Sequence, residues 1–217
     1  MRVLCEKQGT KEWREARQGK ITASVARLAL GRPGTKGRAN YIEQLANDIA
    51  GVPDFAMDED PPWFADGRYY ESWARGWYSW NQSVVVEETG FVVHDEYPWL
   101  GCSPDGLVGE DGMIEVKYRK SLRTWYEHKA LGANAPVIAQ AQTQLLVTGR
   151  RWNDYVNYWR SDDHELEKGS IKRIERDQAY IDDQLLPAFL ALWRDVGELL
   201  TERQERYTAP RENGSNF

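Results

Sequence analysis

The sequence lacks several features that define whole classes of protein. Its 217 residues include only two cysteines, Cys5 and Cys102, which excludes a disulfide scaffold, a four-cysteine zinc site and an iron–sulfur cluster. The longest apolar run, near residues 187–193, is far shorter than the roughly 20 residues that span a bilayer. The first residues, MRVLCEKQGT, contain no apolar segment of a secretory signal. We therefore expect a cytoplasmic protein without a membrane segment.

Two further absences exclude particular enzyme chemistries. The glycine-rich segment GRPGTKG at residues 31–37 lacks the spacing G-x-x-x-x-G-K-[ST] of a phosphate-binding loop, so ATP binding is not supported. The three histidines, His94, His128 and His164, are scattered along the chain, and we find no nucleophile–base arrangement around them. Hydrolysis through a serine or cysteine nucleophile is therefore not indicated.

The charged residues are distributed unevenly. The net charge of −6 argues against a general nucleic-acid coat. Yet residues 14–38 carry seven basic side chains and one acidic side chain, and residues 117–129 carry five basic side chains and one acidic side chain. A protein with this charge separation can present a basic groove to phosphates while it stays acidic overall.

Hydrophobic periodicity predicts helices on both sides of a strand-rich middle. Helices are expected at residues 11–20, 24–30, 39–51, 66–80, 122–131, 136–148 and 176–203. Strands are expected at residues 83–93, 100–108, 113–117, 153–160 and 169–174. Pro187 should loosen the last helix. The order of elements predicts an α/β (α+β) fold, with a central mixed β-sheet flanked by helices, in one domain over residues 1–207 and a flexible tail at 208–217.

A hairpin in the middle of the chain gathers the polar residues that carry chemistry. A loop at residues 109–112 would place Asp105 nearly opposite Val116 and therefore close to Glu115. Glu115 and Lys117 share one strand face because side chains at i and i+2 point the same way. Two carboxylates at this distance repel each other unless a cation lies between them, and oxygen ligands suit Mg²⁺ or Mn²⁺. A metal beside Lys117 could activate water, so the pattern predicts phosphodiester hydrolysis, the alternative being a surface salt bridge.

Four motifs in order along the chain resemble those of a known nuclease family. They are WREARQGKITAS at residues 13–24, GRYYE at 67–71, SPDGLV with IEVK at 103–108 and 114–117, and QAQTQL at 140–145. Each motif is weak alone, but together they resemble the lambda exonuclease family, the YqaJ-type phage recombination nucleases of the PD-(D/E)-x-K superfamily. The resemblance covers residues 13–160 and implies a restriction-endonuclease-like core.

The resemblance implies a set of metal ligands. Asp105 and Glu115 would bind the principal metal ion, with help from the carbonyl of Val116. Asp95 stands ten residues before Asp105, as a family acid does, and would join Asp105 on a second ion. Asp95 could instead be an ordinary turn residue.

The resemblance also implies residues that assist the chemical step. Lys117 would position or activate the attacking water, and Glu71 and Gln140 would complete the site from neighbouring helices. Glu71 could instead be a surface acid, and Gln140 could be a helix residue with its hydrogen bonds satisfied locally.

A terminal 5′-phosphate has its own implied site. Arg17, Ser24 and Ser103 match the family residues that hold this group on the DNA strand. An arginine with two hydroxyl groups is a suitable anion pocket. Ser24 could also cap a helix, and Arg17 could belong to a surface ion pair.

Further DNA contacts are expected outside this pocket. Arg32, Lys36 and Arg38, in and beside a basic loop, are expected to contact duplex phosphates because phosphate binding needs mobile cations. Phe64 aligns with an apolar residue that could wedge between the strands at a duplex end.

The function implied by the resemblance is that of a Mg²⁺-dependent 5′→3′ exonuclease, for which Mn²⁺ could also serve, on linear double-stranded DNA. It would use two ions per site and leave 3′ single strands for recombination by annealing. The resemblance further implies a homotrimer, a single-strand-annealing partner protein and a phage or prophage origin in a bacterial host.

Two alternatives stay open. One is another PD-(D/E)-x-K enzyme, such as an endonuclease or a junction resolvase, and the other is a non-catalytic DNA-end-binding protein on a nuclease fold. The motif with Arg17 and Ser24 favours the exonuclease. The intact set of Asp95, Asp105, Glu115 and Lys117 argues against lost activity.

Overall fold

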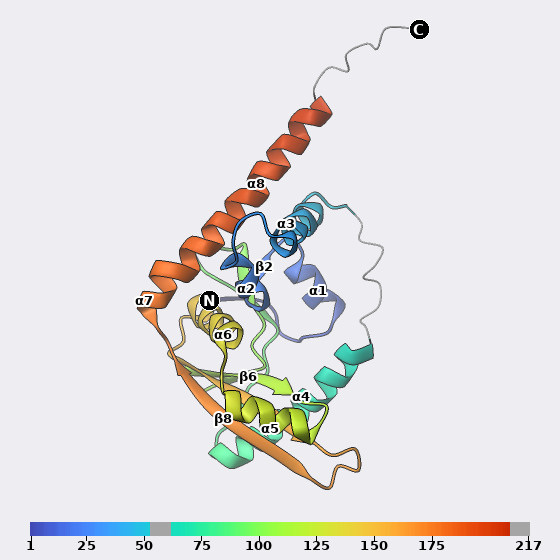
Figure 1. The fold of residues 1–217 in the computed structure, drawn as a ribbon, viewed down its shortest axis with the longest axis vertical. Helices are drawn as coiled ribbons and strands as arrows, with labels where there is room; N and C mark the ends of the chain where they lie inside the picture. The colour runs from blue at the N-terminus through green and yellow to red at the C-terminus, as the bar shows by residue number, and fades with distance from the viewer. Residues whose placement is uncertain (53–61, 209–217) are drawn as a thin grey trace.

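Two four-stranded β-sheets, joined and covered by helices, make up the fold in the computed structural model (Figure 1). The structure describes the backbone of residues 1–52 and 62–208 and the side chains of residues 1–52 and 69–205. The long helix α8 (Leu186–Thr208) extends past the other elements at one end of the molecule (Figure 1). The predicted tail at 208–217 lies, from residue 209 onward, outside the described residues.

The first sheet has the strand order β1-β3-β4-β2. Its strands are β1 (Arg2–Cys5), β2 (Ile21–Thr22), β3 (Phe91–Val93) and β4 (Leu100–Cys102). Strand β3 is antiparallel to both β1 and β4, whereas β2 runs parallel to β4 with Thr22 opposite Gly101. Gly101 is needed here, because a Cβ at this position would lie 2.3 Å from the ring of Phe91. The parallel pair brings the N-terminal motif beside the segment that follows β4.

The second sheet has the strand order β5-β6-β7-β8. Its strands are β5 (Gly106–Val108), β6 (Gly112–Tyr118), β7 (Trp152–Arg160) and β8 (Glu167–Glu175). Strands β5 and β6 form the predicted hairpin, with Gly106 opposite Ile114, and β6 runs parallel to β7 with Met113 opposite Asn153. Strand β8 is antiparallel to β7. The two strands of the motif therefore lie at one edge of this sheet.

The remaining helices are α1 (Lys11–Arg17), α2 (Ala26–Ala29), α3 (Lys36–Ile49), α4 (Pro62–Gln82), α5 (Leu122–Leu131), α6 (Ala135–Thr148) and α7 (Gln178–Tyr180), with the 3₁₀ turn η1 (Ala23–Val25). Four of them, α1, α5, α6 and α7, begin at a residue whose side chain caps the helix. The Thr10 side chain accepts from the N–H of Trp13 at the start of α1, and Asn134 accepts from Val137 at the start of α6. None of the helices in the described residues combines the length and apolar character of a membrane span.

Pro187 coincides with a local widening of the last helix. The π-helical turn η2 (Ile181–Leu185) directly precedes α8, and Pro187 is the second residue of α8. Proline has no N–H to donate to Asp183, four residues earlier, so the regular pattern cannot continue through this point. The structure thus shows where the expected loosening occurs.

Helix α6 lies between the two sheets and belongs to the core of both. Its residue Leu146 packs in the cluster that contains Val92 of the first sheet, and Ala141 packs against Tyr155 of the second. Helix α4 covers the other face of the second sheet, where Tyr78 packs against Ile114. One face of β6 therefore looks toward α4 and the opposite face toward α6.

The predicted α/β class, with mixed sheets flanked by helices, is confirmed, and the strands divide into two four-stranded sheets where one central sheet was expected. The segment 100–108 is not one strand: β4 belongs to the first sheet and β5 to the second, because Pro104 cannot continue a strand ladder between them. The segment 83–93 is a strand only over its last three residues, and Ser83 has a left-handed backbone with φ of 53°. Strand β1 was not predicted.

Candidate active site

The break between β4 and β5 places Asp105 at the edge of the second sheet. The N–H of Asp105 donates to the carbonyl of Ile114 at 3.2 Å, and its Oδ2 accepts from the N–H of Val116 at 2.6 Å. The expected register was shifted by one residue, since Val108 pairs with Gly112 and extension of the ladder puts Asp105 opposite Glu115. The predicted proximity of Asp105 and Glu115 holds in either register.

The carbonyl of Val116 faces the same side as its N–H, because both groups of a strand residue point toward one neighbour. That neighbour would be β5, but β5 begins only at Gly106. The carboxylate of Asp105 takes the place of a ladder acceptor for Val116. A carboxylate oxygen and a backbone carbonyl thus lie together at this edge.

Glu115 is held from three directions on the α6 side of the sheet. It is 3% exposed. Its Oε1 accepts from Lys117 Nζ at 2.6 Å and from Gln140 Nε2 at 2.7 Å, and its Oε2 accepts from Gln144 Nε2 at 2.6 Å. The structure therefore brings together the predicted Glu115, Lys117 and Gln140. Gln144 was not predicted as a site residue, although its position one helical turn after Gln140 signals the same helix face.

Asp105 lies in a strongly acidic environment. Burial, followed by the charges of Glu115 and Glu71, raises the pKa of Asp105 well above its usual range. Lys117 and the N–H of Val116 act in the opposite direction. The carboxylates of Glu115, on strand β6, and of Glu71, on helix α4, therefore both lie near Asp105 at the strand junction.

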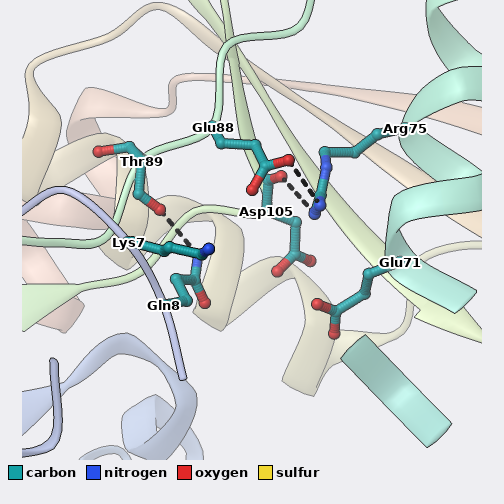
Figure 2. A pocket seen from close by; sticks show the side chains of 7 residues that line it. All are labelled: Lys7, Gln8, Glu71, Arg75, Glu88, Thr89 and Asp105. Carbon is teal, nitrogen blue, oxygen red and sulfur yellow. Dashed lines mark hydrogen bonds and ion pairs between the residues drawn. The ribbon is translucent and has the colours of Figure 1, made fainter. Parts of the chain in front are cut away.

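A pocket of about 140 Å³ opens beside Asp105 (Figure 2). Its lining residues come from the β1–α1 connection, from α4 and from the segments before β3 and β5: Lys7, Gln8, Glu71, Arg75, Glu88, Thr89 and Asp105. Figure 2 shows the carboxylates of Asp105 and Glu71 pointing into the same space, with Lys7 on the opposite side from α4. The pocket thus combines acidic groups with two cations.

Arg75 and Gln8 connect the segments that line this pocket. Neither residue was predicted from the sequence. Arg75 donates to the backbone oxygen of Asp105 at 3.4 Å and forms an ion pair with Glu88 at 3.1 Å. Gln8 donates to the carbonyls of Thr89 at 3.1 Å and Pro104 at 2.8 Å. Arg75 follows Glu71 by one helical turn, which is the sequence signal that could have identified it.

The structure places Asp95 away from this centre. Strands β3 and β4 are antiparallel with Val93 opposite Gly101, so the chain from Val93 to Asp95 and the chain from Gly101 to Asp105 run in opposite directions. The Asp95 carboxylate is 68% exposed and binds the Met1 ammonium at 2.7 Å. The expectation that Asp95 joins Asp105 on a metal ion does not agree with this geometry.

The expected phosphate-binding residues lie near the segment that leads from β4 to Asp105. The indole N–H of Trp13 donates to Ser103 Oγ at 2.9 Å, and the Arg17 guanidinium lies 4.3 Å from the centre of the Trp13 ring. Ser24 follows β2 as Ser103 follows the parallel strand β4, and its hydroxyl lies 2.9 Å from Thr22 Oγ1. The three predicted residues therefore lie at one end of the β2–β4 pair.

Arg17 occupies an environment suited to an anion. Its guanidinium also lies 5.8 Å from the centre of the Phe91 ring, and burial lowers the pKa of Arg17. Among the described side chains, its electrostatic neighbours are the Tyr41 phenol and two thiols rather than a carboxylate. A partly buried guanidinium in such surroundings would gain from a bound anion.

The other expected DNA contacts have different placements. Arg32 and Lys36 are exposed, as the expectation requires. Arg38 is 3% exposed and its guanidinium binds Asp195 of α8 at 2.6 Å, so it is not a mobile surface cation, and its position argues against the expected DNA contact. Phe64 lies on α4, but its side chain is outside the described part of the chain.

A metal ion at this site would need a backbone oxygen as a ligand in addition to carboxylates. In the described part of the chain, no group of three or more His, Cys, Asp and Glu side chains is arranged to hold a metal ion. The oxygen groups that do converge are the carboxylates of Asp105 and Glu115, with the carbonyl of Val116 beside them. This donor set is of the hard oxygen type that suits Mg²⁺ or Mn²⁺.

Comparison with known proteins agrees with this geometry. Residues 12–151 match the family described as the YqaJ-like viral recombinase domain. No curated protein matches the sequence. The crystal structure of the alkaline exonuclease LHK-Exo from Laribacter hongkongensis is similar, with 31% identity, a TM-score of 0.73 and coverage of 92% of this chain and 100% of that one. Its complex with dAMP gives 30% identity, a TM-score of 0.72 and the same coverage.

A more distant structure shares the fold. The phage-related exonuclease from Haemophilus somnus 129PT has a TM-score of 0.65 at 14% identity, with coverage of 85% of this chain and 96% of that one. The family match spans well over half of the chain, and it includes the segments that supply Arg17, Asp105, Glu115 and Gln140. The chain therefore belongs to the YqaJ-like viral recombinase family.

Proposed function

We propose that this protein is a divalent-metal-dependent exonuclease that digests linear double-stranded DNA from the 5′ end and leaves 3′ single strands for recombination by annealing. The observation that carries the proposal is the convergence of Asp105, Glu115 and Lys117 at the junction of the two sheets. Membership of the family, and the likeness to a protein named as an alkaline exonuclease, support the reaction class.

The metal would be held by oxygen atoms that lie near one another at the junction of the two sheets. Asp105, Glu115 and the Val116 carbonyl would form the ligand set, and a cation among them would offset the burial and the carboxylate repulsion that together raise the pKa of Asp105. Glu71 lies near enough to act on Asp105 and can support a second ion in place of Asp95. When bound, a divalent ion lowers the pKa of a water molecule and neutralises charge on a phosphate.

Lys117 and Gln140 would orient the groups that react. Both donate to Glu115 Oε1, so they fix the direction of this carboxylate. The Lys117 side chain is 36% exposed, whereas Glu115 is almost fully buried. Lys117 can therefore reach a water molecule or a phosphate oxygen while it remains beside Glu115, and we assign it the positioning of the attacking water.

The polarity of digestion would follow from the anion pocket. Arg17, Ser24 and Ser103 would hold a terminal 5′-phosphate. Ser103 precedes Asp105 by two residues, which span at most about 7 Å of extended chain. This separation is about the length of one nucleotide of backbone, so a strand anchored by its 5′-phosphate would present its first internal phosphodiester to the carboxylates. Release of mononucleotides is the expected result, and LHK-Exo has been crystallised with such a molecule, dAMP.

The assembly is part of the same proposal. A homotrimer and a single-strand-annealing partner are inferred from family membership, and the substrate is a duplex DNA end. Arg32 and Lys36 are exposed near the N-terminus of α3 and would contact the duplex backbone.

The test compares one DNA in two forms, linear with 5′-phosphates and covalently closed circular, with Mg²⁺. The wild-type protein is compared with Glu115→Ala and with Glu110→Ala, an exposed acid in the β5–β6 loop that serves as the matched control. We expect the wild-type protein to digest the linear DNA only. Glu115→Ala should have lost this activity, and Glu110→Ala should retain it. Cutting of the circle would favour an endonuclease. Binding of ends without any cleavage would favour a non-catalytic end-binding protein.

A further inference from the structure

Glu115 is connected to a buried pair of amides that lies away from the pocket. Gln144 donates from Nε2 to Glu115 Oε2 at 2.6 Å, and Asn153 donates from Nδ2 to Gln144 Oε1 at 2.6 Å. Gln144 is 1% exposed and Asn153 is 0% exposed. The contacts therefore form a chain from β7 through α6 to the carboxylate on β6, sealed from solvent.

The topology explains how the three residues meet. Asn153 is the register partner of Met113 across the parallel pair of β6 and β7. Met113 and Glu115 share a strand face because they are two residues apart, and helix α6 covers that face. Gln144 thus lies above the sheet between Asn153 and Glu115.

The direction of both amides is set by the charge of the carboxylate. An amide has a donor end and an acceptor end, while an ionised carboxylate can only accept. The reverse orientation would place Gln144 Oε1 against Glu115 Oε2, where two acceptors would repel each other. Asn153 disfavours this orientation because its Nδ2 donates a hydrogen bond to Gln144 Oε1 and so holds that oxygen away from Glu115.

Asn153 buries a polar atom at a cost in free energy that an apolar residue at this position would avoid. Its Oδ1 is buried and has no hydrogen-bond partner among the described residues. A buried acceptor left without a partner costs about 1–3 kcal/mol. A leucine of similar size would fill the space without this cost, so the amide is better explained by its action on Gln144 than by packing.

We infer that Gln144 and Asn153 form a positioning pair that fixes the Glu115 carboxylate for metal binding. The inference rests on the proposed function, in which Glu115 is a metal ligand. An ionised carboxylate has about four lone-pair sites. Lys117, Gln140 and Gln144 fill three of them, which leaves one direction for a metal ion. Asn153 lies beyond the segment that matches the family, which ends at residue 151.

The same helix offers a matched control. Gln142 is 2% exposed, like Gln144, but it donates to the carbonyl of Glu175 and accepts from the N–H of Asp177, away from Glu115. Gln142→Met and Gln144→Met each remove one buried amide from α6 with little change in side-chain volume. Only the second change removes a donor from Glu115.

The experiment measures Mn²⁺ binding directly, by titration of the free Mn²⁺ signal in electron paramagnetic resonance, with circular dichroism as the check on folding. We expect the Mn²⁺ dissociation constant of Gln144→Met to rise about 10- to 100-fold, the usual effect of removing a group that orients a metal ligand. Gln142→Met should bind Mn²⁺ like the wild type. Cleavage by Gln144→Met should recover as Mn²⁺ is raised, with KM for DNA unchanged.

Asn153→Leu provides a second variant that leaves Gln144 in place. If Asn153 acts through Gln144, Asn153→Leu should weaken Mn²⁺ binding, and it should cause no additional weakening in the Gln144→Met background. Additive losses of affinity would mean that Asn153 does not act through Gln144. Wild-type Mn²⁺ affinity in a folded Gln144→Met or Asn153→Leu variant would overturn the inference. A wild-type protein that neither binds Mn²⁺ nor cleaves DNA would instead overturn the proposed function.

Discussion

The Trp13 indole donates a hydrogen bond to Ser103 Oγ at 2.9 Å. This contact joins helix α1 to the segment that leads into the candidate active site, across 90 residues of sequence. The same indole ring lies under the guanidinium of Arg17. Trp13 therefore links the proposed phosphate anchor to the chain that carries Asp105.

Arg17→Ala should reduce digestion of 5′-phosphorylated ends selectively. A charge-assisted hydrogen bond to a phosphate is worth about 1.5–3 kcal/mol, so the preference for phosphorylated over hydroxyl ends should fall by about 10- to 100-fold. Initial digestion rates on the two kinds of end measure this preference. Arg14→Ala, an exposed arginine on the same helix, is the control and should keep it. Equal losses on both ends in Arg17→Ala would contradict a phosphate anchor at this position.

Trp13→Phe should weaken the same preference by a smaller factor. Phenylalanine keeps an aromatic ring near Arg17 but has no N–H for Ser103 Oγ. A neutral hydrogen bond contributes about 0.5–1.5 kcal/mol, which corresponds to a change of roughly 2- to 12-fold. Digestion rates on phosphorylated and hydroxyl ends again provide the measurement. A wild-type preference in Trp13→Phe would show that the anchor does not depend on this hydrogen bond.

Lys117→Ala should abolish cleavage and leave DNA binding largely intact. The ammonium contacts Glu115, and in the proposed mechanism it acts on the attacking water rather than on the duplex. Removing one preorganised donor from a reacting centre costs about 10²–10³ in kcat. Single-turnover cleavage and a separate binding measurement without metal would distinguish the two effects. Lys120→Ala, an exposed lysine three residues later, should behave like the wild type. Undiminished cleavage by Lys117→Ala would exclude its proposed role.

The chemistry of β6 could be predicted from sequence because it depends on local geometry. Strand alternation places Ile114 and Val116 on one face and Glu115 and Lys117 on the other, whatever the rest of the fold does. The predicted proximity of Asp105 to Glu115 holds despite the one-residue error in register, because either register leaves Asp105 beside the same short stretch of β6.

The residues that the sequence could not place depend on contacts between distant segments. The spacing of ten residues between Asp95 and Asp105 gives no information about direction, and the antiparallel turn from β3 to β4 separates them. Arg38 appears as one more basic residue until its partner Asp195, 157 residues away, is known. Lys7 reaches the pocket from the β1–α1 connection, and β1 itself was not recognised.

Asp154→Asn should destabilise the protein without affecting the site directly. Asp154 is 1% exposed and accepts from both Nε and Nη2 of Arg173 at 2.9 Å and from the Tyr78 hydroxyl at 2.7 Å. Loss of the charge weakens bonds that are each worth about 1.5–3 kcal/mol, and we expect the free energy of unfolding to fall by about 2–3 kcal/mol. Urea unfolding measures it. Asp111→Asn, whose carboxylate is exposed and lies 3.6 Å from Arg151, should cost less than about 1 kcal/mol.

Arg38 and Lys36 both lie in the first turn of α3, but we expect different roles for them. Arg38 should contribute to stability and Lys36 to DNA binding. Arg38 donates to the carbonyls of Leu28 and Ala29 at the end of α2 and to Asp195 of α8, so it joins three helices. Asp195→Ala leaves this guanidinium buried without its partner and should lower the free energy of unfolding by about 3–5 kcal/mol, measured in urea. Lys36→Ala should leave stability unchanged but reduce the slope of log affinity for DNA against log salt by about 1. Wild-type stability of Asp195→Ala, together with a steeper salt slope for this variant, would show instead that the Arg38 charge is free to bind phosphate.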